Sequence, residues 1–300
     1  MRRDFAYRAH KSFVAPAKSH MQLWRLAFGI LLVVVVFSAL GQLFAGLITL
    51  AAEATGLDAG QLQMGTGETP GAILATLFAY GLLVPSVFLV LWVLHERSGM
   101  TVFGDLKAMK GQFIIVVLAL VIVNVVLEIL PPWGYGADLV SNVAMSQWLV
   151  LLPLSLVAIL AQTSAEEVVF RGYIQQQLGA RFQSPLIWMV LPSALFGLLH
   201  YDTASAGENA WYIALWAMLF GMAAADLTAR SGTLGPAIAL HFVNNVIAML
   251  FVTLPDNWHA LALYVTPFDA SNTEIVRAWL WVDLGFLGVS WLTARLALQR

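Results

Sequence analysis

Eight apolar stretches are spaced along the chain, and each is long enough, or nearly so, to cross a bilayer as a helix of about 20 residues. Short polar segments separate them, so the hydrophobic pattern alternates between spans and turns. This pattern predicts an all-α polytopic membrane protein, a bundle of about eight transmembrane helices. The expected spans cover residues 23–51, 71–94, 112–131, 147–178, 185–200, 211–229, 234–254 and 275–297.

The composition agrees with this class. Hydrophobic residues make up 60% of the chain and charged residues only 11%, with a mean hydropathy of +0.81. A soluble domain of this size carries about twice that share of charge. The net charge of −2 offers no basic surface, so we expect no nucleic-acid partner, and the absence of cysteine excludes disulfides and thiolate chemistry. The expected surroundings are membrane lipids.

Basic residues give the orientation of the spans. If the N-terminal arm is cytoplasmic, all 15 Lys and Arg residues except Arg277 fall toward the cytoplasmic side. This asymmetry follows the positive-inside rule and predicts that both termini are cytoplasmic. The first apolar run is longer than the core of a cleaved signal peptide, so we interpret it as a retained span. Loops 53–70, 132–146 and 255–273 then lie outside.

The fourth apolar stretch contains charges that are expensive in a membrane. Glu166, Glu167 and Arg171 lie in otherwise apolar sequence, where an ionisable group costs a few kcal/mol unless it is paired or hydrated. Glu167 and Arg171 are one helical turn apart, which favours an ion pair between them. Glu166 points elsewhere and is left free to act as a base.

Two histidines also lie in apolar sequence. His200 shares a helix face with Phe196, and His241 shares one with Asn245, because each pair is four residues apart. Asn244 lies only slightly farther round the helix, so spacing separates the two asparagines poorly. Together with the carboxylates, two buried histidines indicate a site rather than packing alone.

A depth argument indicates that these groups can meet. If the fourth and fifth spans turn near residues 183–185, Glu166 and His200 each lie about 25 Å above the turn. His241 reaches the same level only if this hairpin projects about 15 Å into the cytoplasm. The polar segment 201–209 must then run through membrane depth, where irregular backbone needs shelter from protein or water. We therefore expect a membrane-embedded catalytic cavity that opens toward the cytoplasm.

At these residues the chain resembles the CPBP family of intramembrane proteases. That family includes CAAX prenyl endopeptidases and bacterial, Abi-like relatives linked to bacteriocin processing or self-immunity. The resemblance covers roughly residues 145–255. It rests on three ordered motifs, Glu166-Glu167-x-x-x-Arg171, Phe196-x-x-x-His200 and His241-x-x-x-Asn245.

The resemblance implies an intramembrane endopeptidase that hydrolyses a peptide bond of a membrane-associated protein or peptide, lipidated or not. Hydrolysis needs an activated water and a stabilised oxyanion. The implied catalytic residues are Glu166 as general base, His200 beside the water, and His241 with Asn245 at the oxyanion. Glu167 with Arg171 would form a supporting ion pair, and Phe196 a packing wall for His200.

The metal requirement stays open at this point. Glu166, His200 and His241 form a two-His, one-carboxylate set that suits zinc with one open position. The chain has no HExxH motif, and members of the family are described under both metalloprotease and glutamate-protease mechanisms. We expect a site that requires no cofactor, with a single divalent metal such as zinc as the alternative.

Two other classes of function remain. A catalytically silent immunity or scaffold protein would keep the same residues for packing. A transporter would use Glu128, Asp226 and Asp283, which lie in or near spans, although for the two aspartates we favour a structural bond to a neighbouring helix.

The chain divides into four expected regions around a bacterial inner membrane. They are a cytoplasmic arm over 1–22, N-terminal spans over 23–140, a protease core over 141–256, and an outer loop with the last span over 257–300.

Overall fold

The computed structural model describes residues 6–130, 138–256 and 258–299. It confirms the all-α polytopic class. Six helical segments are long and apolar enough to cross a membrane, and two shorter apolar helices lie among them. Each of the eight apolar stretches forms helix over most of its described residues, but two of these helices, Leu186–Leu198 and Gly235–Phe251, fall short of a full span.

The α-helices, in chain order, are α2 Arg8–Phe13, α3 Leu23–Thr55, α4 Pro70–Tyr80, α5 Leu83–His95, α6 Leu106–Ile129, α7 Met145–Glu167, α8 Gln176–Arg181, α9 Leu191–Leu198, α10 Thr203–Ala206, α11 Ala210–Ser231, α12 Gly235–Val246 and α13 Thr273–Ala297. Wider π-helical turns cover Val168–Gln175, Leu186–Val190 and Ile247–Phe251. Short 3₁₀ turns cover Ala15–His20, Ala59–Leu62, Gly99–Val102, Gly207–Asn209 and His259–Leu261.

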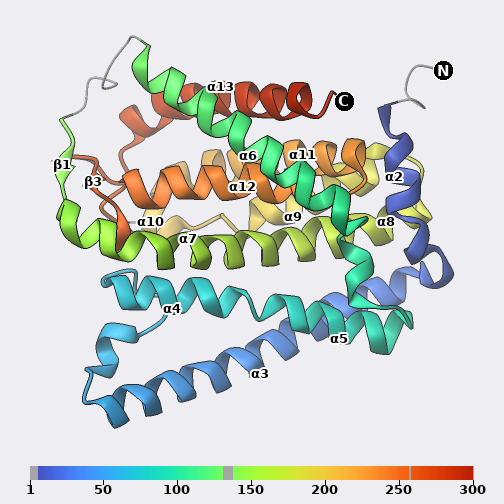
Figure 1. Ribbon diagram of the computed structural model, residues 1–300, viewed down its shortest axis with the longest axis horizontal. Helices are drawn as coiled ribbons and strands as arrows, with labels where there is room; N and C mark the ends of the chain where they lie inside the picture. Colours follow the sequence, from blue (N-terminus) through green and yellow to red (C-terminus); the bar gives the residue numbers. More distant parts are fainter. Residues whose placement is uncertain (1–5, 131–137, 257, 300) are drawn as a thin grey trace.

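The helices surround a central group formed by α7, α9, α11 and α12. In Figure 1, α4, α5 and the oblique α3 lie below α7, while α6 and α13 cross above α12. The central helices bury the polar side chains of Gln162, Glu167 and His241, whereas α3, α6 and α13 expose mainly Leu, Val, Ile and Trp. This distribution fits a bundle whose outer helices face lipid and whose middle holds a polar site.

One span is broken and another is continuous, each for a local reason. The span Pro70–His95 breaks between α4 and α5, where Pro85 in the first turn of α5 has no backbone N–H. The span Met145–Arg181 instead continues, because the π-helical turns Val168–Gln175 join α7 to α8 without a break. Such π segments widen a helix and are frequent at functional sites. This one begins directly after Glu167.

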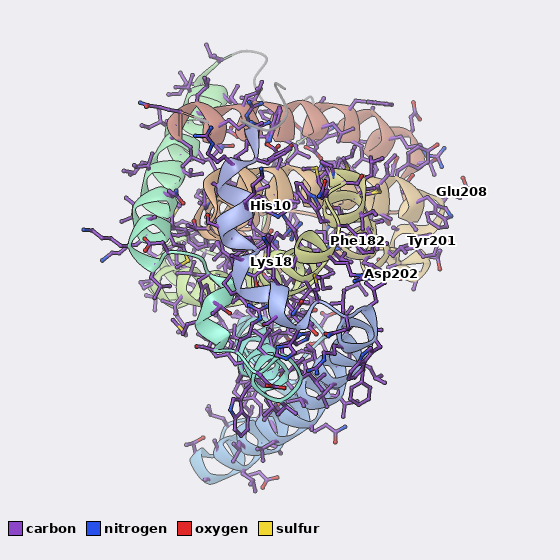
Figure 2. All side chains as sticks on the ribbon, turned by 90° about the vertical axis from the view of Figure 1, so that its right-hand side faces the viewer. His10, Lys18, Phe182, Tyr201, Asp202 and Glu208 are labelled. Atoms are coloured by element: carbon purple, nitrogen blue, oxygen red, sulfur yellow. The ribbon has the colours of Figure 1, made fainter. Side chains whose placement is uncertain are left out.

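The N-terminal arm packs against one end of the bundle. Tyr7 donates a hydrogen bond to Asp226 on α11 (2.7 Å), and Gln176 on α8 donates one to the carbonyl of Phe13 (2.7 Å). His10 is buried against the ring of Trp188, at 4.1 Å between ring centroids. Figure 2 looks onto this end, with His10 and Lys18 on the arm in front. The arm is therefore part of the folded bundle; Arg2 and Arg3 lie outside the described residues.

A small sheet, which the hydrophobic pattern did not predict, lies at the opposite end of the bundle (Figure 1). Its three strands are β1 Val140–Ser141, β2 Val252–Thr253 and β3 Tyr264–Val265, with β3 in the middle. β1 pairs antiparallel with β3, and β2 pairs parallel with it. The sheet ties together the expected outer loops 132–146 and 255–273, of which residues 131–137 and 257 lie outside the described part.

Candidate active site

The two adjacent glutamates lie at the end of α7 and differ sharply in their surroundings. The side chain of Glu167 is fully buried, and its Oε1 accepts a hydrogen bond from Arg171 at 2.8 Å. The Arg171 guanidinium also donates to the carbonyl of Gly221 on α11 (3.0 Å) and lies 5.0 Å from the centre of the Phe196 ring. The expected ion pair is thus present, and the cation is shared among three helices.

His241 on α12 completes this buried cluster. Its Nδ1 lies 2.8 Å from Glu167 Oε1, and its Nε2 lies 3.7 Å from Glu166 Oε2. A carboxylate can only accept, so Nδ1 is the nitrogen that donates to Glu167. The other ring nitrogen, Nε2, faces Glu166.

Glu166 is not left without a partner, and this part of the sequence interpretation was wrong. Its Oε1 accepts a hydrogen bond of 2.7 Å from Nε2 of Gln162, one turn earlier on α7. Helix phase relative to Arg171 alone could not reveal this contact, because the donor lies N-terminal to the glutamate. The side chain of Glu166 is 14% exposed, against 0% for Glu167, so only Glu166 of the two reaches the surface of the protein.

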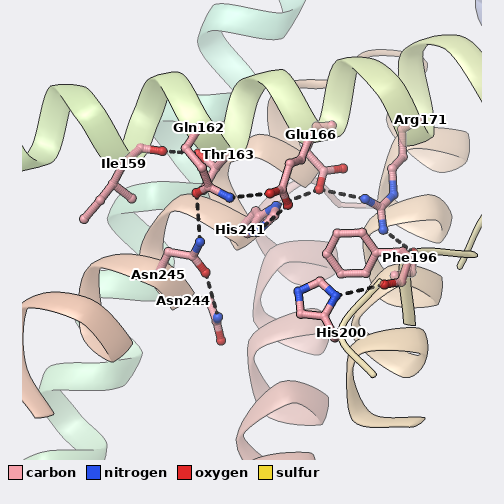
Figure 3. A network of polar contacts seen from close by, with 12 residues as sticks. Ile159, Gln162, Thr163, Glu166, Arg171, Phe196, His200, His241, Asn244 and Asn245 are labelled. Carbon is pink, nitrogen blue, oxygen red and sulfur yellow. Dashed lines mark hydrogen bonds and ion pairs between the residues drawn. The ribbon is translucent and has the colours of Figure 1, made fainter. Parts of the chain in front are cut away.

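Asn245 joins the same network from α12. Its Nδ2 donates to Gln162 Oε1 at 3.0 Å, and its Oδ1 accepts from Asn244 Nδ2 at 3.1 Å. Figure 3 shows the chain of contacts from Asn244 through Asn245 and Gln162 to Glu166. The structure thus separates the two asparagines that spacing could not, since Asn245 is the one bonded to Gln162.

His200 lies at the edge of the cluster. It packs on Phe196, as expected, with 4.6 Å between ring centroids, and its Nδ1 hydrogen-bonds the Phe196 carbonyl at 2.8 Å. The side chain is exposed rather than buried, so the expectation of two buried histidines was wrong for this one. The reason is its place at the C-terminal end of the short helix α9, where the chain turns. No polar contact joins it to Glu166 within the described residues; the Phe196 ring lies between it and Arg171.

A close helix contact holds Phe196 and His200 against the central bundle. At Gly197 on α9 an added Cβ would lie 2.5 Å from the Ala214 carbonyl on α11. Only a residue without a side chain permits this approach. The polar stretch after His200 forms α10 and a 3₁₀ turn, so it is more regular than expected.

The structure does not gather the expected metal ligands. Across residues 6–130, 138–256 and 258–299, no three His, Asp or Glu side chains are grouped so that they could hold a metal ion. Glu166 and His241 are adjacent, but His200 is held at its own helix end by the bond to Phe196. The residues present therefore do not fit a zinc site of this composition, and no catalytic step is assigned to a metal.

Two surface cavities lie away from these residues. One, of about 380 Å³, lies between α3 and the turn Ala59–Leu62; the other, of about 500 Å³, lies where the arm meets the start of α6. Neither is lined by a candidate catalytic residue. The catalytic cavity expected from the sequence stays a prediction.

The carboxylates proposed for transport have separate surroundings. Asp226 accepts hydrogen bonds from Arg230, from Tyr7 of the arm and from Trp291 Nε1 of α13 (3.0 Å), which confirms its structural bond to a neighbouring helix. In the described part of the chain Asp283 makes no such bond, so the expectation failed there.

Sequence reasoning missed Gln162. Its position four residues before Glu166 was the available signal, since i,i+4 side chains meet on a helix face. It was missed because a glutamine is common in helices and carries no charge.

Part of the chain is similar to a known protein family. Residues 146–247 match the model of the family described as "Type II CAAX prenyl endopeptidase Rce1-like", a range that contains every residue of the three motifs. The chain is also 26% identical over 252 residues to "Uncharacterized protein YyaK" of Bacillus subtilis (strain 168), covering 81% of this chain and 82% of that protein. No solved structure matches. The chain is thus a polytopic membrane protein whose residues 146–247 are similar to the Rce1-like type II CAAX prenyl endopeptidase family.

Proposed function

We propose that this protein is an intramembrane endopeptidase in which Glu166 activates the water that attacks a peptide bond. One observation carries the proposal: Glu166 is a partly exposed carboxylate held beside Nε2 of His241 in the middle of a membrane bundle. The cost of placing such a group in a membrane implies that it is used. The family at residues 146–247 supports peptidase chemistry.

Glu166 Oε2 and His241 Nε2 lie 3.7 Å apart, so one water placed beside the pair can contact both atoms. In the proposed step, that water attacks the carbonyl carbon of the scissile peptide while Glu166 takes one of its protons. The same proton then passes to the amide nitrogen as the carbon–nitrogen bond breaks. The products are a new carboxyl terminus and a new amino terminus.

Asn245 is proposed to stabilise the oxyanion formed in this step. One hydrogen of its Nδ2 is used by Gln162, which leaves the second for the substrate oxygen. His200 is exposed and its Nε2 is free of hydrogen bonds within the described residues, so we place it on the substrate side of the site. Glu167 and Arg171 hold His241 in position.

The proposed setting is a bacterial cell membrane with both termini in the cytoplasm. The orientation rests on the basic residues and the setting on the bacterial relative. The substrate is a membrane-associated protein or peptide, lipidated or not. The division into arm, N-terminal spans, protease core and last span also stays a proposal, and its boundary at residue 257 lies outside the described part.

The test compares membrane proteomes of cells that carry the wild-type protein, Glu166→Gln or Asp226→Asn. We expect at least one membrane-protein fragment that is present with wild type and Asp226→Asn but missing with Glu166→Gln. The precursor of that fragment, with and without its lipid, is then incubated with purified protein in liposomes. A Glu166→Gln strain with an unchanged fragment pattern and full biological function would favour a silent scaffold instead.

The metal question is tested on the same purified protein. We expect cleavage to survive washing with a chelator, with no zinc detected by elemental analysis. Loss of activity that returns only with added zinc would contradict the metal-free mechanism.

A further inference from the structure

Gln162 connects two of the proposed catalytic residues that come from different helices. It lies on α7, is buried, and bonds Glu166 on its own helix and Asn245 on α12. We propose that Gln162 is a positioning residue that fixes the Glu166 carboxylate and the Asn245 amide in the orientations hydrolysis needs. This inference rests on the proposed peptidase function and deepens it.

The chemistry of the side chains determines which groups donate and which accept along this chain of hydrogen bonds. Because the Glu166 carboxylate only accepts hydrogen bonds, Gln162 must turn its NH₂ group toward it. The carbonyl oxygen of Gln162 then faces Asn245, which must present its own NH₂ group. Without this constraint an asparagine amide can adopt either orientation, and only one of them offers a donor to an oxyanion.

The same contact gives the two oxygens of Glu166 different roles. Gln162 occupies Oε1 at 2.7 Å, which leaves Oε2 toward His241 as the oxygen that takes the proton of water. A glutamate without this anchor could rotate its carboxylate away from His241. Gln162 therefore sets which oxygen acts as the base.

The other buried glutamines of the same span do not have both ends of the amide hydrogen-bonded. Gln175, Gln176 and Gln177 each use their NH₂ group, but each leaves its carbonyl oxygen without a hydrogen bond. Gln162 uses both ends. A buried amide with both ends satisfied holds one orientation, as a residue that positions catalytic groups must.

The test measures cleavage by Gln162→Met, with Gln175→Met as the matched control. Both changes remove the hydrogen bonds of a buried glutamine and keep the side-chain length, but only the first touches the Glu166 network. For Gln162→Met we expect kcat to fall about 10- to 100-fold, the size typical for residues that orient catalytic ligands, with KM changed less than about twofold. The acidic limb of the pH profile moves to higher pH, because the carboxylate has lost a donor. Gln175→Met keeps the wild-type kcat and profile.

A second variant covers the case in which Gln162→Met does not fold. Gln162→Glu is nearly isosteric, but its side chain and Glu166 can share a hydrogen bond only when one of the two carboxyl groups is protonated. We expect its activity to be low at neutral pH and partly restored at acidic pH. A wild-type profile for Gln162→Glu, or equal kcat for Gln162→Met and Gln175→Met, would overturn the role of Gln162 while leaving the proposed function intact. Activity that survives Glu166→Gln would instead overturn the function itself.

Discussion

Two acid–arginine pairs, each spaced i,i+4 on a membrane helix, have different roles in this molecule. Glu167 and Arg171 are 0% and 1% exposed, whereas Asp226 and Arg230 are 9% and 15% exposed. Both pairs have short contacts, 2.8 Å in the first and 2.7 Å in the second. The local motif is the same, so it does not by itself distinguish a pair in an active site from a pair with a purely structural role.

The third partner of each carboxylate makes the difference. Glu167 accepts from His241, whose other nitrogen faces Glu166, so the first pair belongs to a chain of contacts that leads to a partly exposed carboxylate. Asp226 accepts from Tyr7 of the arm and Trp291 of α13, so the second pair joins structural elements. An intramembrane charge is therefore best interpreted from what its partners touch.

The largest effect on stability is expected for Glu167→Ala. The change leaves the Arg171 cation fully buried without its carboxylate, which costs about 3–5 kcal/mol. We expect a marked loss of thermal stability in detergent together with loss of cleavage. The double variant Glu167→Ala with Arg171→Met removes the unpaired charge and recovers much of the stability without recovering activity. A single variant as stable as wild type would contradict the buried pair.

Acidic pH is expected to lower the stability of the end of the bundle where the N-terminal arm packs. Burial lowers the pKa of His10 to about 4, from about 6.5 in an unfolded chain. The unfolded state therefore binds more protons between these values, so stability falls as the pH drops from about 6.5 to about 4. At one pKa unit per about 1.4 kcal/mol, the loss reaches at most about 3 kcal/mol.

His10→Phe should remove this pH dependence, since a phenyl ring can also pack on Trp188. Thermal denaturation of both proteins at pH 7 and pH 5 measures the effect. Equal pH dependence in the two proteins would exclude His10 as its cause.

The smallest effect on stability is expected for Asp226→Asn. The amide keeps a hydrogen-bond acceptor for Tyr7 or Trp291 and loses only the charge that pairs with the partly exposed Arg230. A stability loss of about 1–2 kcal/mol follows, with unchanged cleavage per folded molecule. If kcat fell as far as it does in variants of the candidate active site, Asp226 would belong to the catalytic machinery. The two acid–arginine pairs would then no longer differ in role.

The sequence was most informative where chemistry and helix phase coincide. Apolar stretches predicted the helical segments, because a membrane requires long runs of apolar residues. The Glu167–Arg171 pair and the packing of Phe196 on His200 followed from four-residue spacing. These contacts lie within one helix and depend on no knowledge of its neighbours.

Contacts between helices could not be predicted from the sequence in the same way. The bond from His241 to Glu167 rather than to Glu166, and the bridge from Gln162 to Asn245, depend on how α7 and α12 rotate against each other. The exposure of His200 depends on where α9 ends. The short strands β1, β2 and β3 also escaped prediction, because two-residue strands carry no periodic pattern.

The central claim is that the Glu166 carboxylate takes part in the hydrolysis and is not needed only for the stability of the bundle. The most direct test is the rate at which equal amounts of folded wild-type and Glu166→Gln protein, in liposomes, cleave the same precursor. Glutamine keeps the size of the side chain but cannot accept a proton from water. We predict that cleavage by Glu166→Gln falls by about 1,000-fold or more while its melting temperature stays near that of wild type. Cleavage within about threefold of wild type would contradict the account.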